Sequence, residues 1–157
     1  RKMIKKFIIL FISFNLISHC GFTPLYSDKS DGNFTITSIE FNGDKEINNY
    51  LKNNLIKFTN NKSEKKYVIK IDSIYSKNIL SKNKAAETTN FELSTNINFQ
   101  ILSNSKILKE FKISEKKIMD NIDDDFEEQK NEKIAKQNFA SSMASKLITE
   151  ISILNDN

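Results

Sequence analysis

The residue in this chain best suited to covalent chemistry is Cys20, the only cysteine among 157 residues. It follows a basic stretch, 1–6, and an apolar run, 7–18. This order is typical of a secretory signal, and a run of about a dozen residues is too short for an ordinary membrane span. Bacterial lipoproteins are cleaved and lipidated at a cysteine in this position. The sequence therefore predicts acyl chains on Cys20, and this covalent lipid is the only cofactor expected.

This interpretation divides the chain into three parts. A lipoprotein signal peptide covers 1–19, a lipidated N-terminus and tether cover 20–33, and a single domain covers 34–157. Several acyl chains on one cysteine meet the requirement of two signals for stable membrane anchoring. Gly21 rather than Asp after the cysteine favours the outer membrane, with the domain facing the periplasm. The alternative is an uncleaved apolar segment in which the cysteine is incidental.

The charge of the chain gives no sign of nucleic-acid binding. Four of the 24 basic residues and none of the 20 acidic residues lie in 1–19, so the remainder is neutral. The basic character of the whole chain therefore belongs to the signal, and no nucleic-acid partner is expected.

The sole histidine, His19, also lies in the signal. The domain thus lacks the Cys/His ligands of common zinc sites and the histidine of a catalytic triad. We predict no catalytic residue and no metal site. An envelope enzyme is an alternative, for which Glu87 and Glu92 are the candidate acids.

Three lysines, Lys77, Lys82 and Lys84, fall in a polar stretch, 76–87, which is expected to be a loop. Lysine binds phosphate as a point charge, so these side chains are candidates for contacts with lipid phosphates. The competing interpretation is a solvated loop in a lysine-rich protein. The acidic run 123–125 lacks the glycine and spacing of a calcium loop and is expected to cap a helix.

Alternating apolar residues predict the strands. Segment 89–101 has one apolar and one polar face, and the polar face carries Asn96, Asn98 and Gln100. Further strands are expected at 34–41, at 67–75 and, after a turn at 103–106, at 107–118. The apolar residues of 34–41 change from even to odd positions between Ile36 and Ile39, which indicates a β-bulge.

Apolar spacings of three and four predict two helices. The first covers 47–58, with Asp44 as its N-cap. The second has a long apolar stripe, formed by Phe126, Ile134, Ala135, Phe139, Met143, Leu147, Ile151 and Leu154, with Lys130 as its one charged member.

The order is β-α-β-β-β-α, an α+β class in which two helices pack on one face of a four-stranded mixed sheet. The predicted core between the sheet and the last helix comprises Phe91, Leu93, Ile97, Phe99, Phe139 and Met143.

Three segments resemble the LPS-assembly lipoprotein LptE family of the alphaproteobacterial type. The sharpest is Cys-Gly-Phe-Thr-Pro-Leu-Tyr at 20–26, and the second is 85–93. The third is Phe126-Glu127 with the later positions Ala135, Ala140, Ala144 and Leu147. The resemblance covers essentially the whole chain.

This resemblance implies a lipoprotein that plugs an LptD-like outer-membrane barrel, helps it fold and binds lipopolysaccharide during transport to the surface. It implies no chemistry. A different outer-membrane lipoprotein scaffold, such as an accessory of barrel assembly or secretion, would share the same sequence features.

Overall fold

The computed structural model describes residues 34–59 and 62–156. Strand β1 (Thr35–Gly43) leads into helix α2 (Lys45–Leu55) and a short 3₁₀ turn, η1 (Ile56–Phe58). Strands β2 (Lys66–Lys82), β3 (Thr88–Ser103) and β4 (Lys106–Asp120) follow, and helix α3 (Asp125–Asp156) ends the described chain. The predicted α+β order is confirmed. Cys20 and the predicted segments 1–19 and 20–33 lie outside the described residues.

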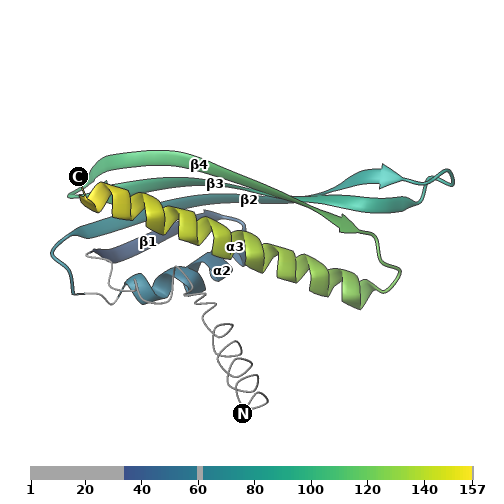
Figure 1. Ribbon diagram of the computed structural model, residues 1–157, viewed down its shortest axis with the longest axis horizontal. Helices are drawn as coiled ribbons and strands as arrows, with labels where there is room; N and C mark the ends of the chain where they lie inside the picture. Colours follow the sequence, from purple (N-terminus) through teal and green to yellow (C-terminus); the bar gives the residue numbers. More distant parts are fainter. Residues whose placement is uncertain (1–33, 60–61, 157) are drawn as a thin grey trace, which may run out of the picture. The chain divides into compact units, whose positions relative to one another are not determined.

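The four strands form one mixed sheet in the order β1-β2-β3-β4. β1 is parallel to β2, and the other two pairs are antiparallel. The predicted bulge in β1 is present between Ile36 and Ser38. Figure 1 shows both helices on the same side of the sheet. None of the described helices is long and apolar enough to cross a bilayer.

The hairpin between β3 and β4 turns through Asn104 and Ser105, which both have positive φ, of 49° and 63°. A two-residue turn with two positive φ angles matches the twist of the flanking strands. The register shifts by one residue between Leu102 and Ile101, and beyond this shift Ile97 lies opposite Ile113 and Phe99 lies opposite Phe111. The apolar phase of β3 thereby faces the helices.

The two helices begin at the expected aspartates. The Asp44 carboxylate accepts hydrogen bonds from the Glu46 and Ile47 amides at 3.0 and 2.8 Å. At the start of α3, the Asp124 carboxylate accepts from the amides of residues 126 and 127. The acidic run before α3 therefore serves as a cap, because side-chain oxygens satisfy amides that the first helical turn leaves free.

The core lies between the sheet and the two helices. Five of its predicted members are buried, and they are Leu93, Ile97, Phe99, Phe139 and Met143. Phe91 is only partly buried against a smaller cluster beside Tyr75. The polar residues Asn96 and Asn98 lie on the opposite face of the sheet and bond to Ser114 and Glu110 of β4.

Two predictions of element extent are wrong. The stretch 76–87 is not all loop, because β2 continues to Lys82 and pairs with β3 as far as Thr88. The apolar stripe of α3 also begins later than expected, since Phe126 is 72% exposed and Ile134 is exposed as well. The first turns of α3 instead reach the sheet through long charged side chains.

Thr95 provides a test of core packing. It lies on the inner face of β3, fully buried, and its hydroxyl has no hydrogen-bond partner in the described part of the chain. A buried hydroxyl without a partner costs free energy, so Thr95→Val is expected to raise the free energy of unfolding by about 1 kcal/mol. Urea unfolding measures this change. Thr89→Val is the control, because the Thr89 hydroxyl bonds Ser81 at 2.6 Å and its loss should not stabilise.

Candidate functional site

The predicted phosphate-binding lysines separate into two groups. Lys77 lies on the inner face of β2, whereas Lys82 ends that strand and Lys84 lies in the turn that follows. Lys82 and Lys84 are exposed, and neither forms an ion pair within the described residues. The structure therefore brings Lys82 and Lys84 together at the tip of the β2–β3 hairpin and places Lys77 elsewhere.

The tip of the hairpin is an ordered turn built on Asn83. Its side-chain oxygen accepts hydrogen bonds from the amides of Ala85 and Glu87 at 2.9 and 3.0 Å. Its amide group donates to the Glu87 carboxylate at 2.8 Å. An asparagine that bonds the backbone two residues ahead fixes a turn locally. Lys82 and Lys84 flank this residue, so their backbone positions are fixed although their side chains extend into solvent.

Lys77 is held by two carboxylates of α3. Its Nζ lies 2.7 Å from Glu128 Oε1 and 3.0 Å from Glu132 Oε2. It also lies 4.4 Å from the centre of the Phe91 ring, a cation–π contact. Because these contacts already satisfy the ammonium group, Lys77 is a poor candidate for an additional phosphate.

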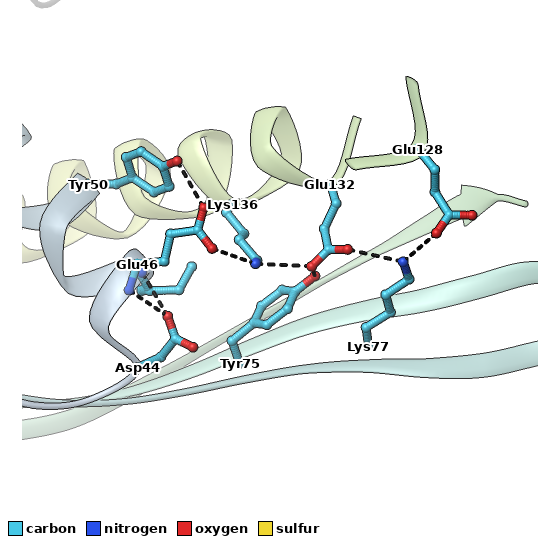
Figure 2. Close-up of polar contacts among 9 residues, drawn as sticks. Asp44, Glu46, Tyr50, Tyr75, Lys77, Glu128, Glu132 and Lys136 are labelled. Carbon is cyan, nitrogen blue, oxygen red and sulfur yellow. Dashed lines mark hydrogen bonds and ion pairs between the residues drawn. The ribbon is translucent and has the colours of Figure 1, made fainter. Parts of the chain in front are cut away.

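Glu132 links β2 to a second lysine. Its carboxylate accepts a hydrogen bond from the Tyr75 hydroxyl at 3.0 Å and lies 3.0 Å from Lys136 Nζ. Lys136 also contacts Glu46 of α2 at 2.7 Å. Figure 2 shows the resulting chain of contacts running from α2 through α3 to β2. The network therefore connects α2, α3 and β2. A hollow of about 480 Å³ beside it is lined partly by Glu46, Glu132 and Lys136.

The electrostatics of this network keep its groups charged. Partial burial would raise the pKa of Glu132, but hydrogen bonds from Lys136, Lys77 and Tyr75 outweigh it and hold the pKa below the ordinary 4.5. Burial opposes the charge on Lys77 and Lys136, yet their carboxylate partners raise both pKa values above 10.5. The pKa of Tyr75 is raised mainly by burial and also by its hydrogen bond to Glu132. Near neutral pH these groups favour ion pairing over proton transfer.

Sequence reasoning missed this network, although part of it had a signal. Glu128, Glu132 and Lys136 are spaced four residues apart, which places them on one face of a helix. What the pattern could not show is that this face meets Tyr75 and Lys77, since those residues were expected at a strand end and in a loop.

The two candidate acids of an envelope enzyme have different partners. Glu87 accepts from Asn83 in the hairpin turn, whereas Glu92 pairs with Lys116 of β4 at 2.9 Å. Among the described residues, no group of three or more His, Cys, Asp or Glu side chains could hold a metal ion. The two carboxylates therefore bind separate partners.

Comparisons with known proteins relate the chain to bacterial lipoproteins through its fold. No family model matches it, and no curated protein sequence matches it. The crystal structure of the rare lipoprotein B from Shewanella oneidensis is 12% identical, with a TM-score of 0.58 over 76% of this chain and 97% of that one. The solution structure of an uncharacterized lipoprotein B from Nitrosomonas europaea is 15% identical, with a TM-score of 0.58 over 80% and 88%.

A putative lipoprotein from Caulobacter crescentus CB15 is 14% identical, with a TM-score of 0.55 over 80% of this chain and 93% of that one. This chain has the lipoprotein B fold. The match spans nearly the full length of these structures, so it concerns the whole α+β domain rather than one hairpin or helix.

The ion-pair network predicts a pH-dependent stability. Glu132→Gln removes the charge but keeps the shape, and is expected to lower the free energy of unfolding by about 1–2 kcal/mol near neutral pH. Since the folded pKa of Glu132 is depressed, its contribution is present above the ordinary pKa of 4.5 and is lost as pH falls through the lower folded value. Urea unfolding at about pH 7 and about pH 3 should therefore show a smaller difference between wild type and variant at the lower pH.

Glu127→Gln is the matched control on the same helix. Glu127 pairs with Lys130 at 3.1 Å on an exposed surface, where a single ion pair contributes little. Equal losses for the two variants would contradict a structural role for the Glu132 contacts.

Proposed function

We propose that this protein is an outer-membrane lipoprotein that plugs an LptD-like barrel and supports lipopolysaccharide transport to the cell surface. The observation that carries the proposal is the likeness of the domain to solved lipoprotein B structures, which agrees with the resemblance of the sequence to the LptE family. The apolar run 7–18 ahead of Cys20 and the segment 20–26 support it independently. In this proposal acyl chains on Cys20 hold the domain at the periplasmic side of the outer membrane.

The polar face of the sheet supports a plug inside a water-filled lumen. Asn96, Asn98 and Glu110 lie on this face, and a hollow of about 400 Å³ at its β1 side is lined partly by Asn42 and Gln100. Such a face can exchange hydrogen bonds with water or with the polar lining of a barrel, so its polar groups keep hydrogen-bond partners when the domain is enclosed there. The domain acts by binding and not by catalysis.

Co-purification from detergent-solubilised outer membranes tests this function. A tagged full-length chain is expected to retain a barrel at one copy to one copy, and depletion of the chain should lower the amount of correctly folded barrel. A Cys20→Ala variant is the control, because loss of the anchor should reduce both recovery and labelling by a fatty-acid analogue. A barrel that assembles normally and never retains this chain would contradict the proposal, and capture of another envelope complex would favour the scaffold alternative.

The hairpin tip provides a prediction about lipopolysaccharide. If Lys82 and Lys84 contact lipid phosphates, Lys82→Glu with Lys84→Glu should weaken lipopolysaccharide binding about tenfold or more at low salt, and less at high salt. Barrel association should be unchanged. The control is Lys52→Glu with Lys106→Glu, which makes the same change in net charge at exposed sites away from the tip. Equal weakening by both pairs would indicate a general charge effect without a specific contact.

A further inference from the structure

One end of the domain gathers segments that are far apart in the sequence. Strands β1 and β2 begin there, with Thr35 paired to Lys66. The β3–β4 turn lies at the same end, because β3 is antiparallel to β2 and ends where β2 begins. Figure 1 shows the end of α3 beside the start of β4, where Lys109 pairs with Glu150. We call this surface the basal end, and it comprises the segments 56–66, 103–109 and 150–156.

The basal end carries a surplus of positive charge. Its three segments contain six lysines and three acidic residues. One lysine pairs with Glu150, and Lys65 donates a hydrogen bond to the main-chain carbonyl of Asn155. The other four lysines are exposed and form no ion pair within the described residues, and they are Lys57, Lys62, Lys66 and Lys106. Their ammonium groups are therefore available to an anionic surface.

The opposite end of the domain carries a surplus of negative charge. It comprises 77–87 around the β2–β3 turn and 118–132 at the start of α3, which the Asn121 amide connects to the Thr89 carbonyl at 2.8 Å. These two segments contain four lysines and eight acidic residues. The 16 residues of β3 link the two ends and separate them by about 50 Å. The charge of the domain is therefore divided along the length of the sheet.

Exposed aliphatic side chains accompany the lysines of the basal end. Ile56, Ile107 and Leu108 are 53%, 49% and 43% exposed, and each is adjacent to a lysine in the sequence. Lysines beside exposed apolar side chains are typical of surfaces that lie at a membrane interface, where apolar groups enter the headgroup layer and ammonium groups meet lipid phosphates. The opposite end also exposes an apolar side chain, Phe126, but its acidic residues are repelled by an anionic surface.

We propose that the basal end rests on the anionic phospholipid surface of the membrane that holds the lipid anchor, before the chain engages a barrel. This orientation rests on the anchoring at Cys20 that the proposed function includes, but it needs no barrel. The tether predicted at 20–33 joins the domain at Phe34, directly before β1 begins at the basal end. Because 14 residues reach at most about 50 Å, the tether alone permits many orientations, and the charges of the domain select this one.

Fluorescence quenching in vesicles tests this contact in the full-length lipidated chain. Ile107→Cys and Ile118→Cys place the same fluorescent label on β4 at exposed positions of the basal and the opposite end. The vesicles contain equal parts of phosphatidylcholine and phosphatidylglycerol, with some headgroups spin-labelled as quenchers. Since each lysine near such a surface contributes about 1 kcal/mol, quenching is expected to be about threefold or more stronger at Ile107→Cys. Wild type, with Cys20 alone, is the blank.

Flotation of the same vesicles separates a failure of this contact from a failure of the proposed function. Equal quenching of the two labels, or none at Ile107→Cys, in a chain that floats with the vesicles would overturn the contact and leave the anchor intact. A chain that does not float would overturn both. Equally strong quenching at Ile107→Cys in vesicles of phosphatidylcholine alone would also overturn the proposal, because anionic lipid would then have no role. Absence of a co-purified barrel would overturn only the plug, since these vesicles contain no barrel.

Charge reversal tests whether the lysines of the basal end make the contact. Lys62→Glu with Lys66→Glu is expected to lower the ratio of contacting to free domain about tenfold or more at low salt, as measured by quenching of the label at Ile107→Cys. The loss should be smaller at high salt, where the charges are screened. Lys112→Glu with Lys133→Glu is the matched control, because it makes the same change in net charge at exposed lysines outside the basal end. Equal losses for both pairs would overturn the proposal.

Discussion

Phe99→Ala is expected to remove about 3–5 kcal/mol from the free energy of unfolding, which is a large share of the stability of a small domain. Phe99 is fully buried in the main core and stacks on Phe111 of β4, with ring centres 5.3 Å apart. Truncation leaves a cavity between the sheet and α3, and neighbouring side chains relax into it only in part. Urea unfolding monitored by circular dichroism measures the loss.

Asn98→Ala is the matched control, one residue away on the same strand. Asn98 lies on the polar face and donates to Glu110 at an exposed site, so its loss should change stability by about 0.5 kcal/mol or less. A larger cost for Asn98→Ala than for Phe99→Ala would mean that β3 presents the opposite face to the helices. Phe139→Ala should behave like Phe99→Ala, because Phe139 is buried on α3 against Leu93 and Met119.

The register of β3 was predictable because its alternation is long and unbroken. A slip by one residue would expose every apolar side chain from Leu93 to Ile101 at once, so one register is strongly favoured. The caps were predictable for a related reason. Asp44 and Asp124 each precede a helical apolar pattern, and a short polar side chain there satisfies free amides.

The length of β2 was not predictable from its own residues. Segment 76–82 contains serine, asparagine and lysine, which are typical of loops. It is a strand because β3 supplies a partner for each residue from Ser76 to Ile79. Lys77 is accepted on the inner face because Glu128 and Glu132 come from α3 to meet it. Both causes involve residues far apart in the sequence.

The same dependence on residues that are far apart in the sequence explains the error at the start of α3. Phe126 fits the helical spacing of the buried stripe, but spacing alone does not show where the opposing surface ends. Glu128 and Glu132 reach Lys77 and Tyr75 by their side chains, while the apolar contacts begin at Ala135. Of the three lysines predicted from the sequence, Lys82 and Lys84 remain candidates for phosphate, and Lys77 belongs to the structural network.

Gly43→Ala is expected to lower the free energy of unfolding by at least about 3 kcal/mol, because the alanine has no space and an unfavourable backbone angle. Gly43 ends β1 with a φ of 90°, and a Cβ atom there would lie 1.9 Å from the Ser73 carbonyl oxygen. β1 and β2 would have to separate at this point. Their separation would break the Asp44–Ser73 bond and the buried contact between Ser73 Oγ and Asn48 Oδ1 at 2.8 Å.

Ser73→Ala separates this steric effect from the loss of a hydrogen bond. It removes the hydroxyl without moving the strands, so it should cost about 1–2 kcal/mol in urea unfolding, clearly less than Gly43→Ala. Equal losses of stability for the two variants would mean that the close approach of Gly43 to the Ser73 backbone does not matter for folding. Gly43 is also where β1 turns away into α2, and no described strand pairs with this side of β2 beyond Ser73. A residue that fixes the end of β1 therefore also sets how far β1 and β2 pair.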